Sequence, residues 1–181
     1  MSVLSRETYV ADIGAGAMGA GIAQVAAQAG HPVMLYDTRP GAAAEGRAGI
    51  DRQLSRLVEK GKLQAAERAV ICNRLHPVDS LEALADAGLV IDAIVEDLQV
   101  KQTLFQQLES VCRSDCILAS NTSSLSITRL ASGLQRPEQV VGMHFFNPAP
   151  LMALVEVVSG LATAPDVAAV VHATAQAWGK R

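Results

Sequence analysis

The sequence predicts an α/β protein with a doubly wound, mostly parallel sheet and a helical hairpin after the second strand. Short apolar runs alternate along the chain with longer segments of helical periodicity, which is the pattern of such sheets. A glycine-rich hexapeptide separates the first apolar run from the first helical segment. Polar residues follow several of the apolar runs, and the carboxyl ends of parallel strands meet at one edge of a sheet. The sequence therefore predicts a ligand crevice at that edge.

Apolar runs and helical periods predict the elements in order. Strands are expected at 9–13, 32–36, 89–95, 116–119, 139–143 and 151–158, with shorter ones at 70–72 and 76–78. Helices are expected directly after the glycines and at 41–60, from 64 onward, and at 81–87, 99–112, 126–133 and 165–178. Gly61 is a stop signal between the two segments of the hairpin, and Pro165 suits the first turn of the last helix.

The glycine-rich stretch has the spacing of a dinucleotide-binding turn. Its residues are Gly14, Ala15, Gly16, Ala17, Met18 and Gly19. The first glycine allows the tight turn, the second lets a pyrophosphate approach the backbone, and the third lets the helix pack closely on the strand. The free N–H groups at the helix start would face the phosphates. On its own this hexapeptide is a weak signal.

Asp37 strengthens the prediction of a cofactor site. It ends the second apolar run, 18 residues after Gly19, where a carboxylate can accept hydrogen bonds from the adenosine ribose and repel a 2′-phosphate. NAD is therefore favoured over NADP, although Arg39 could soften that preference. The alternative for Asp37 is a plain turn residue before Pro40.

Asp12 fits the pattern badly. It lies inside the first predicted strand, where both faces of a parallel sheet are normally apolar. Burial of an unpaired carboxylate is unfavourable. Three outcomes stay open: a partner satisfies Asp12, its side chain escapes at the strand end, or it weakens the domain.

Length and composition suit one domain over residues 1–181. Half of the residues are apolar, the net charge is −3, and no basic run favours a nucleic-acid partner. No apolar stretch is long enough to span a membrane, and no signal-peptide core precedes Thr8. Cys72, Cys112 and Cys116 are interpreted as reduced thiols of a cytoplasmic protein rather than as a metal site.

His144 is the best candidate for chemistry. It ends a predicted strand, and Glu156 lies in the following apolar run. If these strands are antiparallel, Glu156 can accept from one imidazole nitrogen and leave the other free to move a proton. Ser123 could hydrogen-bond the same substrate oxygen, although it or Ser124 could instead cap the next helix. The alternatives are a solvent-facing Glu156 and a Ser-His-Glu hydrolase, which the absence of G-x-S-x-G disfavours.

Taken together, the motifs resemble the NAD-binding domain of the 3-hydroxyacyl-CoA dehydrogenases, in family order over almost the whole chain. The matching segments are 14–23, Asp37, 94–97 with Lys101, 120–124, and 144–156. The last two segments are specific to this family, whereas the first occurs in many dinucleotide enzymes. The long version of the 97–102 segment is most similar to bacterial 3-hydroxybutyryl-CoA and 3-hydroxyadipyl-CoA dehydrogenases of hydroxybutyryl-CoA or aromatic-acid metabolism.

The resemblance implies a Rossmann-type domain and NAD-dependent oxidation of an L-3-hydroxyacyl-CoA to a 3-oxoacyl-CoA. His144 would be the general base, and Glu156 would pair with it. Ser123 and Asn147 would position the substrate and the nicotinamide. Glu96 and Lys101 would lie near the nicotinamide ribose, and Lys60 would meet the CoA phosphates. No metal is implied.

Two residues and the chain length depart from the family pattern. Asp12 replaces an apolar residue, and Ala153 stands where a lysine is common. Family members continue with one more strand and a helical domain that covers the substrate, supplies a catalytic asparagine and forms a homodimer. The chain is therefore expected to be a fragment that binds cofactor with reduced or no turnover.

Two other readings stay open from the sequence. The 3-hydroxyisobutyrate dehydrogenase group shares the glycine motif but uses a catalytic lysine on a later helix. A non-catalytic NAD-binding structural or sensor protein would need no complete active site. The segment from His144 to Pro148 disfavours the first reading, and the presence of Ser123, His144 and Glu156 disfavours the second.

Overall fold

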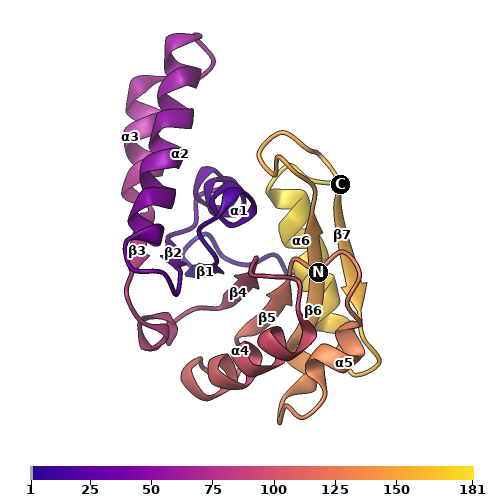
Figure 1. Ribbon diagram of the computed structural model, residues 1–181. Helices are drawn as coiled ribbons and strands as arrows, with labels where there is room; N and C mark the ends of the chain where they lie inside the picture. The colour runs from indigo at the N-terminus through magenta and orange to yellow at the C-terminus, as the bar shows by residue number, and fades with distance from the viewer. Residues whose placement is uncertain (1) are drawn as a thin grey trace.

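The computed structural model describes residues 2–181 and contains one seven-stranded sheet (Figure 1). The strands are β1 (Val10–Ile13), β2 (Val33–Tyr36), β3 (Leu75–Val78), β4 (Leu89–Asp92), β5 (Ile117–Ser120), β6 (Val140–Phe145) and β7 (Val155–Ser159). Their order across the sheet is β3-β2-β1-β4-β5-β6-β7. Every neighbouring pair is parallel except β6 and β7, which are antiparallel. The predicted doubly wound, mostly parallel sheet is confirmed.

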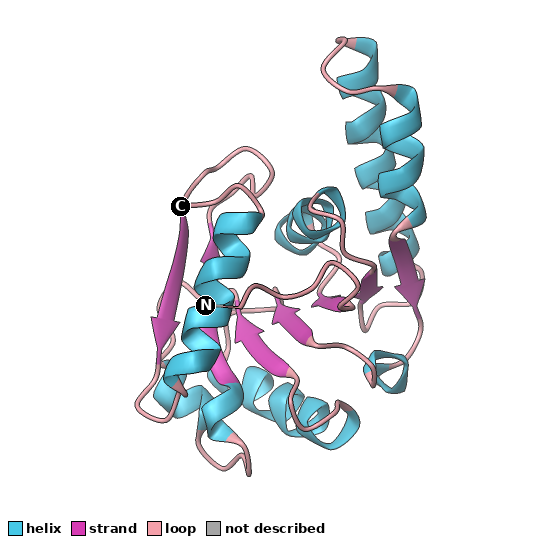
Figure 2. Ribbon diagram, turned by 180° about the vertical axis from the view of Figure 1, so that it is seen from behind, coloured by secondary structure: helices cyan, strands magenta, loops and turns pink. Residues whose placement is uncertain are grey.

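Helices cover both faces of the sheet (Figures 1 and 2). They are α1 (Ala17–Gln28), α2 (Ala42–Glu59), α3 (Ala65–Asn73), α4 (Leu98–Val111), α5 (Ile127–Ala131) and α6 (Pro165–Ala177). One apolar core lies between the sheet and α1, α2, α3 and α6, and a second lies between the sheet and α4 and α5. Two short 3₁₀ turns, η1 (Leu81–Leu84) and η2 (Pro137–Gln139), complete the chain.

The predicted helical hairpin is formed by α2 and α3, and it projects from the body of the domain (Figure 1). Gly61, two residues past the end of α2, has a φ of 69°, a conformation that favours glycine at a helix end. Gln64 and Glu67 cap the start of α3 reciprocally. An ion pair between Arg68 and Asp51, 2.8 Å from nitrogen to oxygen, joins the two helices.

Several element bounds differ from the sequence prediction. Residues 70–72 are helical and lie near the end of α3, where Ile71 packs into the core and Val70 is exposed. The last strand begins at Val155, since the Leu151 and Met152 N–H groups both bond the Pro148 carbonyl in a turn. The expected helix at 81–87 is only the 3₁₀ turn η1. Neither Ser123 nor Ser124 caps α5; Ser126 does, accepting from the Arg129 N–H.

Asp12 is fully buried in β1, on the face covered by α1. Neither of its carboxyl oxygens has a hydrogen-bond partner within residues 2–181. Burial and, secondarily, the nearby negative charge of Asp92 raise the pKa of Asp12 well above its usual range, although the backbone of Ala23 offsets part of this. Within residues 2–181, the structure contradicts two of the three outcomes left open by the sequence, a satisfying partner and an escape at the strand end.

Within residues 2–181, no helix combines the length and apolar character required to cross a bilayer. Cys72, Cys112 and Cys116 are free thiols in the structure.

Candidate active site

The glycine-rich turn joins β1 to α1 at the carboxyl edge of the sheet. Gly14 has a φ of 101°, and a Cβ there would approach the Ala93 carbonyl oxygen to 2.7 Å. A Cβ at Gly19 would overlap the Gly14 carbonyl, so the helix packs as closely on the strand as glycine permits. A Cβ at Gly16 would meet nothing within 4 Å, so the backbone of this residue faces open space. The turn thus offers an exposed helix start to an anion.

Asp37 lies beside this turn at the end of β2. Its Oδ2 accepts the Ala15 N–H at 2.8 Å, and its Oδ1 accepts the Arg39 N–H at 2.8 Å. The Arg39 guanidinium lies 3.8 Å from the same Oδ1. The carboxylate therefore braces the glycine-rich turn and remains at the rim of the crevice.

A cavity of ≈ 420 Å³ lies at this edge of the sheet. It is lined by Ile13, Gly14, Gly16, Asp37, Thr38, Arg39, Ala93, Ile94, Val95 and Val100. The lining combines free backbone at Gly16, a carboxylate at Asp37 and apolar walls from the β4 end. These residues fit an adenosine diphosphate group, with the phosphates at the start of α1.

A buried charge network lies behind the β4 end. The Lys101 ammonium on α4 is 1% exposed, and its Nζ lies 2.5 Å from Asp92 Oδ1 and 3.4 Å from Ser120 Oγ. Glu96 is its third partner, with 3.6 Å from Oε2 to Nζ. Lys101 is therefore a core residue that links two strand ends. Asp92 could not be predicted as its partner, because nothing in the sequence near Lys101 identifies the residue that it contacts.

Glu96 connects the β4 end to the loop after β5. Its Oε1 accepts hydrogen bonds from the Thr122 hydroxyl and from the Ser123 N–H, the latter at 3.3 Å. Burial opposes ionisation of Glu96, but the Thr122 hydroxyl, the Lys101 charge and the Ser123 N–H outweigh it and lower the pKa of Glu96. Ser123 is thus held at the crevice by its backbone, with its side chain exposed.

Asn121, which the sequence places in the matching segment 120–124 without a role of its own, connects the same loop to β6. Its side-chain oxygen accepts the Phe145 N–H at 2.7 Å. The bond fixes the loop that carries Ser123 against the end of the strand that carries His144. The signal in the sequence that indicates this contact is the position of Asn121, which begins an Asn-Thr-Ser-Ser stretch directly after a strand.

His144 and Glu156 face each other across the antiparallel strands. The register of β6 and β7 pairs these two residues directly, and His144 Nδ1 lies 2.9 Å from Glu156 Oε2. The His144 side chain is 15% exposed and that of Glu156 is 53% exposed. The Phe146 ring lies 4.5 Å from the imidazole, centroid to centroid. One ring nitrogen is therefore bound to a carboxylate, while Nε2 is left for another partner.

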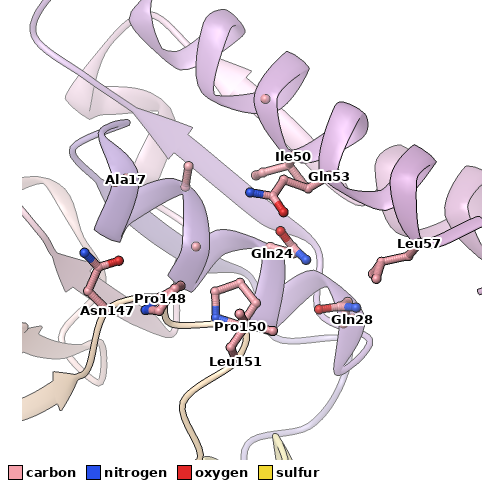
Figure 3. Close-up of a pocket in the computed structure, with 13 residues that line it drawn as sticks. Ala17, Gln24, Gln28, Ile50, Gln53, Leu57, Asn147, Pro148, Pro150 and Leu151 are labelled. Atoms are coloured by element: carbon pink, nitrogen blue, oxygen red, sulfur yellow. The ribbon is translucent and has the colours of Figure 1, made fainter. Parts of the chain in front are cut away.

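A groove of ≈ 490 Å³ lies between α1, α2 and the turn after β6 (Figure 3). Its polar groups are the side-chain amides of Gln24, Gln28, Gln53 and Asn147, and its apolar lining includes Ile50, Leu57, Pro148, Pro150 and Leu151. Asn147 lies at the end near the start of α1, whereas Gln28 and Leu57 lie at the other end (Figure 3). Lys60 follows the last residue of α2, is exposed, and is not among the lining residues.

The fold and the glycine-rich turn define a dinucleotide-binding α/β domain. Residues 9–181 match the sequence model of the family described as "3-hydroxyacyl-CoA dehydrogenase, NAD binding domain". The chain belongs to this family, as the motifs predict, and NAD is its cofactor. The match also selects this family over the 3-hydroxyisobutyrate dehydrogenase reading.

The relatives of the chain carry matching names. It is 51% identical to the 3-hydroxyadipyl-CoA dehydrogenase of Escherichia coli K12, over 95% of this chain and 36% of that protein. It is 48% identical to a probable 3-hydroxybutyryl-CoA dehydrogenase of Deinococcus radiodurans, over 93% of this chain and 60% of that protein. A crystal structure of an Escherichia coli K12 3-hydroxybutyryl-CoA dehydrogenase superposes with a TM-score of 0.95 at 50% identity, over 98% of this chain and 38% of that one. The chain thus spans only about a third to three fifths of these relatives.

Proposed function

We propose that this chain is the cofactor-binding and proton-transfer part of an NAD-dependent L-3-hydroxyacyl-CoA dehydrogenase. The observation that carries the proposal is the His144–Glu156 pair, 2.9 Å apart at the edge of the sheet where the cofactor cavity also lies. An imidazole held by a carboxylate suits a general base, and a dinucleotide site beside it suits hydride transfer. The match to the family supports the same assignment.

In the proposed reaction, the substrate hydroxyl gives its proton to His144 Nε2. Glu156 accepts a hydrogen bond from the Nδ1–H group of His144, and it therefore fixes the tautomer in which Nε2 can take up a proton. Its negative charge also stabilises the imidazolium that forms. The C3–H bond breaks as the C3–O bond becomes a carbonyl. NAD⁺ supplies the acceptor for that hydride when it is bound. Ser123 and Asn147, which are both exposed beside the crevice, position the substrate oxygen and the nicotinamide.

The acyl-CoA is proposed to lie in the groove between α1 and α2. A pantetheine arm alternates amides with short methylene runs, and the groove alternates glutamine side chains with apolar ones. Its end at Asn147 adjoins the site of chemistry. Lys60, which directly follows α2 beyond Leu57, is the proposed contact for the CoA phosphates, in keeping with its exposed position.

Turnover is proposed to need a segment outside residues 1–181. Glu156 is half exposed, and water at the site would weaken the pair and compete for the proton. The relatives are also much longer than this chain. A helical segment that covers the substrate and forms a homodimer, and a cytoplasmic location, are parts of this proposal.

The test is a titration of the chain with NADH, followed by nicotinamide fluorescence, with and without acetoacetyl-CoA. We expect NADH to bind in preference to NADPH, and acetoacetyl-CoA to strengthen its binding. The control is His144→Gln, which should bind NADH normally. In a protein that turns over, the same variant should lose about 10²–10⁴-fold in rate.

Two results would contradict the proposal. A folded chain that binds neither NADH nor NAD⁺ would remove the cofactor role. A chain that binds NADH while acetoacetyl-CoA has no effect on it, and whose longer form shows no turnover, would favour the non-catalytic NAD-binding alternative.

A further inference from the structure

Lys180 holds the turn that follows β6. Its Nζ donates to the Ala149 carbonyl oxygen at 2.6 Å and to the Met152 carbonyl oxygen at 2.8 Å. These two acceptors lie on either side of Pro150, so a single ammonium bridges the turn. The partners are separated from Lys180 by 31 and 28 residues, so the sequence gives no sign of the contact.

The backbone of the next residue continues this connection into β7. Arg181 donates its N–H to the Ala153 carbonyl at 2.9 Å and accepts the Val155 N–H at 3.1 Å. Because Glu156 follows Val155 directly, the same segment fixes the turn and the start of the strand that carries Glu156. These two bonds use the backbone only, so a side-chain substitution at Lys180 leaves them in place.

The burial of the Lys180 ammonium is energetically unfavourable. The residue is only 8% exposed, and burial lowers the pKa of its amine. The polar cavity beside it is also lined by Arg6 and Arg74, and no carboxylate from the described residues 2–181 lines it. A buried cation without a carboxylate partner contributes little to the stability of the fold, and an apolar side chain could fill the same space. Its two hydrogen bonds to the turn are what an apolar residue could not replace.

The turn itself is a wall of the proposed substrate groove. Asn147, Pro148, Pro150 and Leu151 all line it, and Figure 3 places them against α1. A Cβ at Gly21 would approach Pro150 Cδ to 3.1 Å, so the turn already touches the helix backbone. The turn is thus held between α1 on one side and the Lys180 ammonium on the other.

We propose that Lys180 is a positioning residue that sets the part of the groove wall formed by Pro148, Pro150 and Leu151 for the acyl-CoA. This inference rests on the proposed function, because it assigns the acyl-CoA to that groove. Lys180 touches neither substrate nor cofactor. It acts through the two carbonyl oxygens that it holds, and its effect falls on the groove rather than on the glycine-rich turn.

The test compares Lys180→Met with the wild-type chain in two separate titrations, one with NADH and one with acetoacetyl-CoA. Loss of two charge-assisted hydrogen bonds should weaken acetoacetyl-CoA binding about tenfold or more, with the NADH dissociation constant unchanged. Lys180→Arg, which keeps the donors, should recover most of the affinity. The matched control is Arg6→Met, which removes a cation from the same cavity without touching the turn and should change neither titration.

A readout that needs no ligand follows the turn directly. The amides of Leu151 and Met152 bond the Pro148 carbonyl, and their hydrogen exchange should accelerate at least tenfold in Lys180→Met but not in Arg6→Met. The single tryptophan, Trp178, is buried with its ring 6.4 Å from that of Phe145 and reports through its fluorescence whether the surrounding fold is intact.

The outcomes separate this proposal from the proposed function. Unchanged acetoacetyl-CoA affinity and unchanged exchange in Lys180→Met would overturn the proposal, and so would equal losses for both ligands, which indicate a general structural role. If Lys180→Met does not fold, Lys180→Gln is judged by the same two criteria. If the wild-type chain binds NADH but no acetoacetyl-CoA, the substrate assignment fails and this proposal fails with it, while the exchange result still decides whether Lys180 holds the turn.

Discussion

Two buried carboxylates on neighbouring strands have opposite surroundings. Asp12 on β1 and Asp92 on β4 are both fully buried, at positions one step apart in the register of the sheet. Asp92 faces α4 and meets the Lys101 ammonium at 2.5 Å, whereas Asp12 faces α1 and meets no donor within residues 2–181. The comparison separates what burial does to a carboxyl group from what a partner does to it.

The difference shows that a buried carboxylate finds a cationic partner on one face of the sheet and none on the other. On the α1 face, a Cβ at Gly19 would overlap the Gly14 carbonyl and come within 3.4 Å of Asp12 Oδ1, so the helix backbone lies directly over the carboxyl group. The α4 face admits Lys101, whose stem lies among apolar residues while its ammonium reaches the strand end.

The largest effect is expected from Lys101→Met, which turns Asp92 into a second unpaired carboxylate. Loss of one partner from a buried pair should lower the free energy of unfolding by about 3–5 kcal/mol. Urea unfolding followed by circular dichroism measures it. A change below about 1 kcal/mol would show that the pair contributes little and would remove the contrast with Asp12.

A smaller gain in stability is expected from Asp12→Val. Valine removes a buried polar group that has no partner and should raise the free energy of unfolding by about 1–3 kcal/mol. The same urea experiment measures it, with Asp12→Asn as the control, because the amide keeps the shape and the unsatisfied polar atoms. A destabilised Asp12→Val would mean that the carboxyl has a favourable interaction in solution.

The pH dependence of the free energy of unfolding separates two effects of Asp12, the ionisation of its carboxyl group and the burial of a polar group. Because the pKa of Asp12 is raised in the folded chain, the folded state holds this proton at pH values where the unfolded state has lost it. Its contribution to stability is therefore most favourable below the unfolded pKa of about 3.9 and declines as pH rises toward the folded pKa, by at most about 1.4 kcal/mol per pH unit. Asp12→Asn should remove this decline from a series of urea curves, and an identical pH profile in both proteins would contradict it.

The smallest effect is expected from Thr122→Val, a buried residue that bonds Glu96 at the edge of the paired network. Loss of the hydroxyl bond to Glu96 should raise the pKa of Glu96 toward its usual range and cost about 0.5–1.5 kcal/mol. Nuclear magnetic resonance of the Glu96 carboxyl carbon follows the pKa. An unmoved titration would assign its pKa shift to Lys101 instead.

Local pattern was sufficient for most of the fold. The parallel sheet, the α2–α3 hairpin and the family followed from apolar periodicity and from motifs such as that at 14–19, because strands, helices and glycine turns depend on neighbouring residues. The errors at 70–72 and 151–154 arose where short apolar runs suit a helix end, a turn and a strand equally well. Only packing in the complete domain decided between them.

The partners of buried charges depended on the tertiary structure alone. The sequence indicated that Asp12 was anomalous and that His144, Glu156 and Asp37 were candidates, since residue type and spacing carry that information. It could not indicate that Lys101 would meet Asp92, or that Lys180 would hold the turn after Pro148, because these contacts join separate strands and helices. The pKa of a charged group and its contribution to stability depend on the groups that lie within a few ångströms of it. Those groups come together only when the sheet and the helices have packed.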